Sequence, residues 1–186
     1  ISGVGYEPEG DFSVNGNIIE PLKDQDLKAL LETSRLCNHA RIHKEGKQWK
    51  AIGSPTEAAL ITVSEKAKLL TVHYDHIICE FSFNSTRKRM SVIEKCEDGL
   101  KAHIKGATEV LLPLCNTILV NGKEEKIDQQ MRKNIEKAYK VFADKGLRTL
   151  ALARRTLPEN TPLDESTIET NLTFLGIAGI IDPPRP

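Results

Sequence analysis

Apolar residues recur at helical spacing in several segments of the chain. From Pro21, leucines return at roughly helical intervals as far as Leu36, which predicts a helix that begins at the proline. Residues 54–70 predict a second helix, because Ser-Pro-Thr-Glu opens it with a capping residue and a proline in the first turn. Asp128 predicts the start of a further helix, which runs to about residue 145 and ends before a glycine.

Alternating apolar and polar residues predict strands in most of the remaining chain. An Asn-Gly turn at 121–122 is the strongest hairpin signal, and a second turn is predicted at Asn84-Ser85. A short helix is predicted at 107–114. The predicted strands are 1–6, 48–52, 76–83, 87–95, 100–105, 118–120, 123–127, 147–154 and 172–180. Because they connect mainly through hairpins or helix pairs, we predict an α+β fold with a mostly antiparallel, twisted sheet flanked by helical hairpins.

The composition predicts a single domain with a sizeable core. The chain has 186 residues, which is enough to bury such a core. Its 26 basic and 26 acidic residues give a net charge of zero, so we expect no nucleic acid as a partner. The longest apolar run, 174–181, is too short to span a bilayer, so we expect no membrane insertion of this chain. The four cysteines lack zinc-ligand spacing, and no metal site is expected.

A short run at 104–109, Ile-Lys-Gly-Ala-Thr-Glu, carries the clearest candidate chemistry. Lys105 follows an apolar stretch, Gly106 allows a ligand close to the backbone, and a helix begins directly afterwards. Helix starts favour anions, and a lysine beside one suits phosphate. The alternative for Lys105 is simple solvation at a strand end. Neither G-x-x-x-x-G-K-[ST] nor G-x-G-x-x-G occurs, so a bound nucleotide would be gripped mainly through its base.

Two aromatic residues, Phe81 and Phe83, are expected on one face of a strand because strand side chains alternate. Phe83 lies at the strand end beside the turn, where an aromatic ring can be offered to a base. The alternative is that both rings belong to the core. Lys88 is expected on the same apolar face as Met90, as a phosphate contact or as part of a solvated basic run.

The pattern around Glu57 and the position of Arg148 each allow two interpretations. In Ser54-x-x-Glu57 the carboxylate accepts from the Ser54 N–H as part of a capping box, or it contacts a ligand with Thr56 beside it. Arg148 shares a strand face with apolar residues, and its guanidinium either binds a phosphate or reaches a carboxylate at the sheet edge.

The run at 105–109 resembles the Lys-Gly-Ala-x-Glu signature of the nucleotide-binding domain of P-type cation-transporting ATPases. The opening and Leu-Cys-Asn-His-Ala at 36–40 look most like the calcium-pump subgroup. The resemblance spans the whole chain and implies one nucleotide-binding domain, 1–186, whose residues 182–186 start the hinge to a phosphorylation domain. The other segments that match the family, in the order it requires, are GVGYEPEG at 3–10, GSPTEAAL at 53–60, FNSTRKRMSV at 83–92, KGLRTLALARR at 145–155 and DPPRP at 182–186.

The resemblance implies an ATP site. Phe83 is expected to stack on adenine, and Glu57 to accept from the adenine amino group with Thr56 as a weaker neighbour. The residues that the resemblance places toward the phosphates or ribose are Lys88, Lys105, Gly106 and Arg148.

The resemblance also implies a mechanism and a setting. The domain is expected to hold ATP and to present its γ-phosphate to an aspartate of a separate phosphorylation domain. That other domain is expected to be the main holder of the Mg²⁺ ion. The phosphorylation and actuator domains of the parent chain are then its protein partners, and it is a cytoplasmic domain of an integral membrane protein. Alone, it is not expected to hydrolyse ATP. A calcium pump is favoured, while a sodium or other cation pump, or a β-rich interaction domain without nucleotide binding, stays open.

Overall fold

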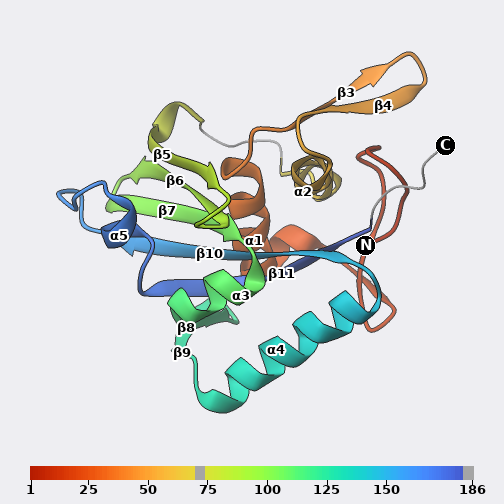
Figure 1. The fold of residues 1–186 in the computed structure, drawn as a ribbon. Helices are drawn as coiled ribbons and strands as arrows, with labels where there is room; N and C mark the ends of the chain where they lie inside the picture. Colours follow the sequence, from red (N-terminus) through yellow and green to blue (C-terminus); the bar gives the residue numbers. More distant parts are fainter. Residues whose placement is uncertain (70–73, 182–186) are drawn as a thin grey trace.

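A computed structural model describes residues 1–69 and 74–181, and strands within these residues form one central sheet with helices on both faces (Figure 1). The helices are α1 (Gln25–Leu36), α2 (Pro55–Lys66), α3 (Thr108–Leu111), α4 (Gln129–Asp144) and α5 (Glu165–Ile168). Short 3₁₀ turns lie at Pro21–Lys23, Tyr74–His76 and Leu112–Leu114. The strands are β1 (Phe12–Val14), β2 (Asn17–Ile19), β3 (Arg41–Glu45), β4 (Gln48–Ile52), β5 (Ile77–Asn84), β6 (Arg89–Cys96), β7 (Gly99–Gly106), β8 (Cys115–Val120), β9 (Lys123–Lys126), β10 (Arg148–Leu157) and β11 (Leu172–Ile180).

The central sheet has the strand order β5-β6-β7-β10-β11-β8-β9 among the described residues. Its neighbouring strands are antiparallel, apart from the parallel pair β11 and β8. Two further hairpins, β1–β2 and β3–β4, stand outside it, and the second extends away from the body beside α2 (Figure 1). The predicted α+β fold with a mostly antiparallel sheet is thereby confirmed.

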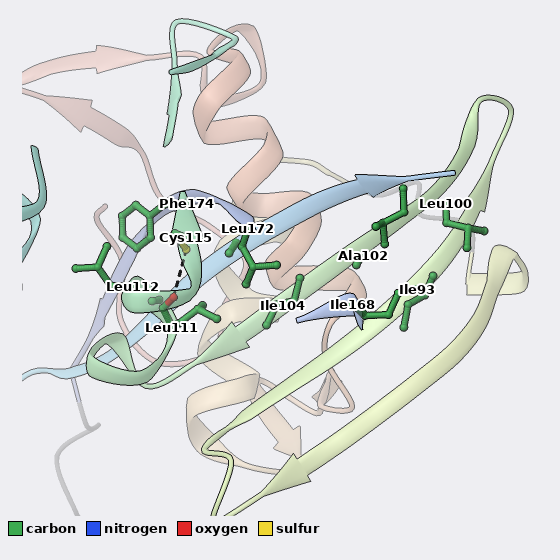
Figure 2. Close-up of a cluster of buried hydrophobic side chains, with 13 residues drawn as sticks. Ile93, Leu100, Ala102, Ile104, Leu111, Leu112, Cys115, Ile168, Leu172 and Phe174 are labelled. Carbon is green, nitrogen blue, oxygen red and sulfur yellow. Dashed lines mark hydrogen bonds between the residues drawn. The ribbon is translucent and has the colours of Figure 1, made fainter. Parts of the chain in front are cut away.

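Each face of the central sheet buries its own apolar side chains. On one face, called the α1 face, Met90 of β6 packs against the end of α1 and Leu152 of β10 packs against its middle. On the opposite face, Ile104 lies toward Leu111 of α3 and Ile93 lies beside Ile168 of α5, within one buried cluster (Figure 2). Successive strand residues point to opposite faces, so one strand supplies both cores. Full burial of each such side chain contributes roughly 1.5–3 kcal/mol.

Acidic caps begin the helices close to where the sequence predicts them. The Asp128 side chain accepts from the N–H of Met131 at the start of α4. The helix predicted from Pro21 begins later, since the proline opens only a 3₁₀ turn. Asp24 then caps α1 by accepting from the N–H groups of Asp26 and Leu27. A carboxylate that satisfies two amides of a helix start fixes that start more firmly than a proline does.

Several local predictions are wrong or incomplete. Residues 1–6 form no strand within the described chain, and the predicted loop that follows contains the β1–β2 hairpin. Strand β3 and helix α5 were not predicted, because β3 is largely polar and exposed and α5 has only four residues. Residues 70 and 182–186, which fall in the predicted second helix and the expected hinge, lie outside the described residues.

The Asn121-Gly122 hairpin is confirmed, and an unexpected helix contact reinforces it. Both residues have positive φ, at 51° and 75°, as the tight hairpin turn requires. The Asp26 carboxylate accepts from both turn N–H groups at 2.7 Å. The β8–β9 turn is therefore tied to the first turn of α1 across the edge of the sheet.

A buried histidine joins α1 to the α1 face of the sheet. Nε2 of His103 lies 3.1 Å from Glu94, and since a carboxylate only accepts, this nitrogen donates. Nδ1 is then free to accept from the Thr33 hydroxyl at 2.8 Å. The His103 hydrogen bond, aided by the charge of nearby Lys101 and opposed by burial, lowers the pKa of Glu94 from 4.5 to about 2.

We expect Glu94→Gln to weaken the domain at neutral pH but not in strong acid. A depressed folded-state pKa gives stability that is complete above about pH 4.5 and is lost as the pH falls toward 2. Allowing for solvent screening, the loss at pH 7 is about 1–2 kcal/mol. Urea unfolding at pH 7 and at pH 2.5 measures it, and an equal loss at both values would show that the carboxylate charge is not the cause.

Candidate functional site

The candidate residues converge on one end of four neighbouring strands. Phe83 lies at the end of β5, Lys88 directly precedes β6, Lys105 and Gly106 end β7, and Arg148 opens β10. Antiparallel pairing of β5, β6, β7 and β10 brings these strand ends together at the same end of the sheet. The first turn of α2, with Glu57, joins them on the α1 face through a contact with Lys105. Residues separated by up to 91 positions in the sequence therefore form one surface.

Glu57 and Lys105 form a buried ion pair at the centre of this surface. The Lys105 ammonium donates to Glu57 Oε1, and their side chains are only 7% and 19% exposed. Lys105 shares the α1 face with Met90, its partner across the β6–β7 ladder. Its charge is neutralised by Glu57 of α2, which excludes the alternative of simple solvation at the strand end.

The predicted capping box around Ser54 is not formed. Ser54 is the N-cap of α2 and Pro55 occupies its first turn, as predicted. In the described structure, however, the Ser54 side chain makes no capping hydrogen bond. The Glu57 carboxylate points to Lys105 instead. A buried ammonium without a counterion costs far more than an unsatisfied amide at an exposed helix start, so the lysine is the favoured partner.

Asn38 fixes the backbone that carries Glu57. Its amide nitrogen donates to the carbonyl oxygens of Glu57 and Ser34, each at 3.0 Å, and its oxygen accepts from the N–H of Ala40 at 2.8 Å. The neighbouring Cys37 thiol donates to the Met90 carbonyl at 3.4 Å. The sequence analysis assigned no role to Asn38, because its burial and its bond to the Glu57 carbonyl depend on a helix 19 residues away and leave no local signal.

Burial also sets the chemistry of the Cys37 thiol beneath the site. Burial away from solvent raises the pKa of this thiol from 9.0 to about 12, although the positive charge of Lys105 lowers it in part. The thiol therefore stays protonated at neutral pH and serves as a hydrogen-bond donor rather than as a nucleophile.

Phe81 and Phe83 do not share one face of their strand. Phe81 pairs with Ser91, while Asn84 pairs with Arg89, so two residues of β5 oppose the single residue between them, Met90. This bulge interrupts the alternation on which the prediction rested. Phe81 packs against the core, whereas Phe83 is 64% exposed and lies in the bulge opposite Met90, whose partner in β7 is Lys105. Phe83, Met90 and Lys105 thus follow one another in a row across three strands.

Lys88 lies in the turn before β6 and not in the strand, so the predicted sharing of a strand face with Met90 is wrong. Its φ is +49°, and its half-exposed ammonium lies 3.8 Å from Glu109. The Lys88 carbonyl accepts from the N–H of Ala107 at 3.0 Å. At Gly106, a Cβ would lie 2.6 Å from Arg89 Cβ and 2.8 Å from the Lys88 oxygen. Glycine is therefore required here by the turn that packs on it.

Arg148 and Thr56 lie at the margin of this surface. Arg148 is the exposed first residue of β10, pairs with Ile180, and shares the α1 face with Leu152 and Lys105. It stands four residues beyond the level of Lys105, or about 13 Å along the strand. Thr56 is half-buried in the first turn of α2.

A pocket of about 590 Å³ lies beside the site on the α1 face. His39 and Glu80 form part of its lining, and they are hydrogen-bonded to each other at 2.8 Å. Burial raises the pKa of Glu80, but the hydrogen bonds from Ser82 and His39 outweigh it, and the net pKa is lowered. Glu80 is thus an anion at neutral pH on the side of the site away from Arg148.

The described residues offer neither a membrane-spanning helix nor a metal-binding cluster. Among residues 1–69 and 74–181, no helix combines the length and hydropathy needed to cross a bilayer. Over the same residues, no three His, Cys, Asp or Glu side chains cluster in a way suited to a metal ion.

Comparison with known proteins identifies the domain. Residues 26–186 match the family described as P-type ATPase, cytoplasmic domain N. The chain belongs to this family. This N domain is 34% identical over its full length to a calcium-transporting ATPase of Bacillus subtilis (strain 168) and 35% identical to the cation-transporting ATPase pma1 of Synechocystis. It is also 32% identical over its full length to the human calcium-transporting ATPase type 2C member 1. It spans about a fifth of the length of these relatives, at 21%, 21% and 19%.

Proposed function

We propose that this N domain binds ATP at the converging ends of β5, β6, β7 and β10. The observation that carries the proposal is the row formed by the exposed Phe83 ring, Met90 and the buried Lys105–Glu57 pair. A bare aromatic ring beside a desolvated charge pair suits a base, which offers a π-face to the ring and polar edges to the charges. In a member of the P-type ATPase N-domain family, adenine is the fitting base.

The orientation of the nucleotide follows from the layout of charges. Adenine stacks on Phe83, and Glu57 accepts from its amino group while it still holds Lys105, with Thr56 beside it. The phosphates extend toward the cations at the strand ends, Lys88 and Arg148. Arg148 stands about 13 Å from the level of Lys105, a span suited to ribose and phosphates rather than to the base. Gly106 keeps the turn that carries Lys88 close to β7.

In the parent chain this site serves phosphoryl transfer. The N domain holds ATP and presents its γ-phosphate to an aspartate of the phosphorylation domain. The phosphorylation domain is also the main holder of the Mg²⁺ ion. The actuator domain is the further partner within the same chain, and all three are cytoplasmic parts of a membrane-embedded pump. Similarity to calcium-transporting ATPases supports Ca²⁺ as the transported ion, and similarity to a cation-transporting ATPase keeps Na⁺ or another cation as the alternative.

We expect this domain to bind ATP weakly and without strict need for magnesium. The described surface has no loop of successive backbone amides around the phosphates and relies on two exposed cations, so the Kd is expected at about 0.1–1 mM. Magnesium is expected to have little effect because residues 1–69 and 74–181 hold no carboxylate cluster suited to it. Calorimetry with and without Mg²⁺ tests both points. Sub-micromolar binding or complete magnesium dependence would contradict this description of the site.

A further inference from the structure

A buried carboxylate on the opposite face of the sheet holds the turn that flanks the nucleotide site. Glu169, at the C-terminal end of α5, is only 1% exposed. Its Oε1 accepts from the Arg87 guanidinium and from the Ser91 hydroxyl, and its Oε2 accepts from Arg89 Nε at 2.5 Å. One side chain thus gathers donors from both the β5–β6 turn and β6. The sequence analysis gave no role to Glu169 or Ser91, and its alternative of a solvated basic run does not hold for Arg87 and Arg89, whose side chains are only 10% and 18% exposed.

The contacts of Glu169 reach both ends of the segment from Phe83 to Lys88. Arg87, which is held by Glu169, also donates to the Ser82 carbonyl at 2.7 Å, within the bulge that contains Phe83. On the other side of the turn, Arg89 pairs with Gly106 across the β6–β7 ladder. Glu169 is therefore connected to the backbone immediately before Phe83 and immediately after Lys88.

The other described contacts of the turn are local, partly exposed, or limited to one backbone hydrogen bond, from the Ala107 N–H to the Lys88 carbonyl. Asn84 closes the turn locally, since its side chain accepts from Thr86 N–H and its carbonyl accepts from Lys88 N–H. The ion pair of Arg87 with Glu165 at 3.3 Å involves a half-exposed carboxylate. Without the Glu169 charge, two largely buried guanidiniums would repel each other at this point.

We propose that Glu169 is a positioning residue for nucleotide binding, which sets the direction of the Phe83 ring and the placement of Lys88 through Arg87 and Arg89. The proposal rests on the proposed ATP site. It assigns to the α5–β11 connection, on the far side of the sheet, control over the affinity for an adenine nucleotide.

The test combines Glu169→Gln and Arg87→Gln with a control in the same connection, Arg155→Gln. Arg155 donates to the Thr167 carbonyl at 2.6 Å and to the Thr170 hydroxyl, so it ties α5 to β10 through contacts away from the β5–β6 turn. ATP titrations are made at a temperature where all variants are folded. Losing a charge-assisted hydrogen bond raises the Kd about tenfold in each of the first two variants, and the double variant is no weaker than either. Arg155→Gln keeps its Kd within about twofold of the parent.

Amide exchange supplies a readout that needs no nucleotide. The Lys88 N–H donates to Asn84 and the Ala107 N–H donates to Lys88, so both report on the turn. We expect both amides to exchange faster in Glu169→Gln and to be unchanged in Arg155→Gln. If Glu169→Gln does not fold, Ser91→Ala removes one of the donors and keeps the carboxylate, with a Kd about two- to threefold above the parent.

The proposal is overturned if folded Glu169→Gln or Arg87→Gln binds ATP like the parent, or if Arg155→Gln weakens binding equally. Parent-like affinity of both Ser91→Ala and Arg87→Gln overturns it in the same way. Failure of the parent to bind ATP would instead refute the proposed function, and the positioning role in nucleotide binding with it. If the parent binds ATP but the Lys88 and Ala107 amides exchange in Glu169→Gln as they do in the parent, the role of Glu169 is refuted and the proposed function stands.

Discussion

Replacement of Phe83 by alanine is expected to abolish measurable ATP binding while the domain melts almost as the parent does. Stacking of a base on an aromatic ring contributes roughly 1–3 kcal/mol, which is a large share of a weak total affinity. Because the ring is 64% exposed, its removal costs about 0.5 kcal/mol or less of folding stability. Titration calorimetry and thermal melts of the same sample measure the two effects separately.

Phe81→Ala is the matched control for that substitution. This ring packs against Ile93 and its neighbours in the core, so truncation is expected to lower the free energy of unfolding by about 3 kcal/mol. Below its melting transition, the variant should still bind ATP with a Kd close to that of the parent. If Phe81→Ala lost binding with an unchanged melt while Phe83→Ala unfolded, the roles of the two rings would be reversed.

Breaking the Glu57–Lys105 pair is expected to destabilise the fold more than loss of a helix cap would. Glu57→Gln leaves the Lys105 ammonium, whose side chain is 7% exposed, without its ion-pair partner, and such a loss costs about 3–5 kcal/mol for a buried pair. Loss of a cap alone costs about 0.5–2 kcal/mol. Urea unfolding of Glu57→Gln therefore separates the observed contact from the predicted capping box.

The double variant Glu57→Gln/Lys105→Met separates folding from binding. With both charges removed, an apolar side chain fills the space and the stability is expected to return to within about 1–2 kcal/mol of the parent. ATP binding should remain lost, because both proposed polar contacts are gone. As a control, Glu109→Gln breaks the exposed pair with Lys88 and should cost less than about 0.5 kcal/mol. Recovery of ATP binding in the double variant would show that neither charge contacts the nucleotide.

The features that could be predicted from the sequence are those with local causes. The Asn121-Gly122 turn needs positive φ at both residues, and Asp128 needs only the amide of Met131, so each signal lies within a few residues. The short helix predicted at 107–114 is found as α3 followed by a 3₁₀ turn. The order of the strands in the sheet, by contrast, is set by pairing between distant segments and carries no local signal.

The geometry of the site was not predictable for the same reason. Whether Glu57 caps its own helix or neutralises Lys105 depends on a strand 48 residues away. The bulge that separates Phe83 from Phe81 is visible only in the register of β5 against β6. Glu169 has no local motif at all, and its partners lie 78 to 82 residues earlier in the chain.

The most direct test of the ATP site is a pair of amide chemical-shift titrations of this domain, one with ATP and one with GTP, each to several millimolar. Saturable shifts with ATP are expected at the ends of β5, β6, β7 and β10 and in the first turn of α2, around Phe83, Lys105, Arg148 and Glu57. GTP should produce smaller shifts, because guanine presents a carbonyl oxygen where adenine presents the amino group proposed to donate to Glu57. An absence of shifts at millimolar ATP, or shifts confined to another surface, would contradict the site and favour a β-rich interaction domain.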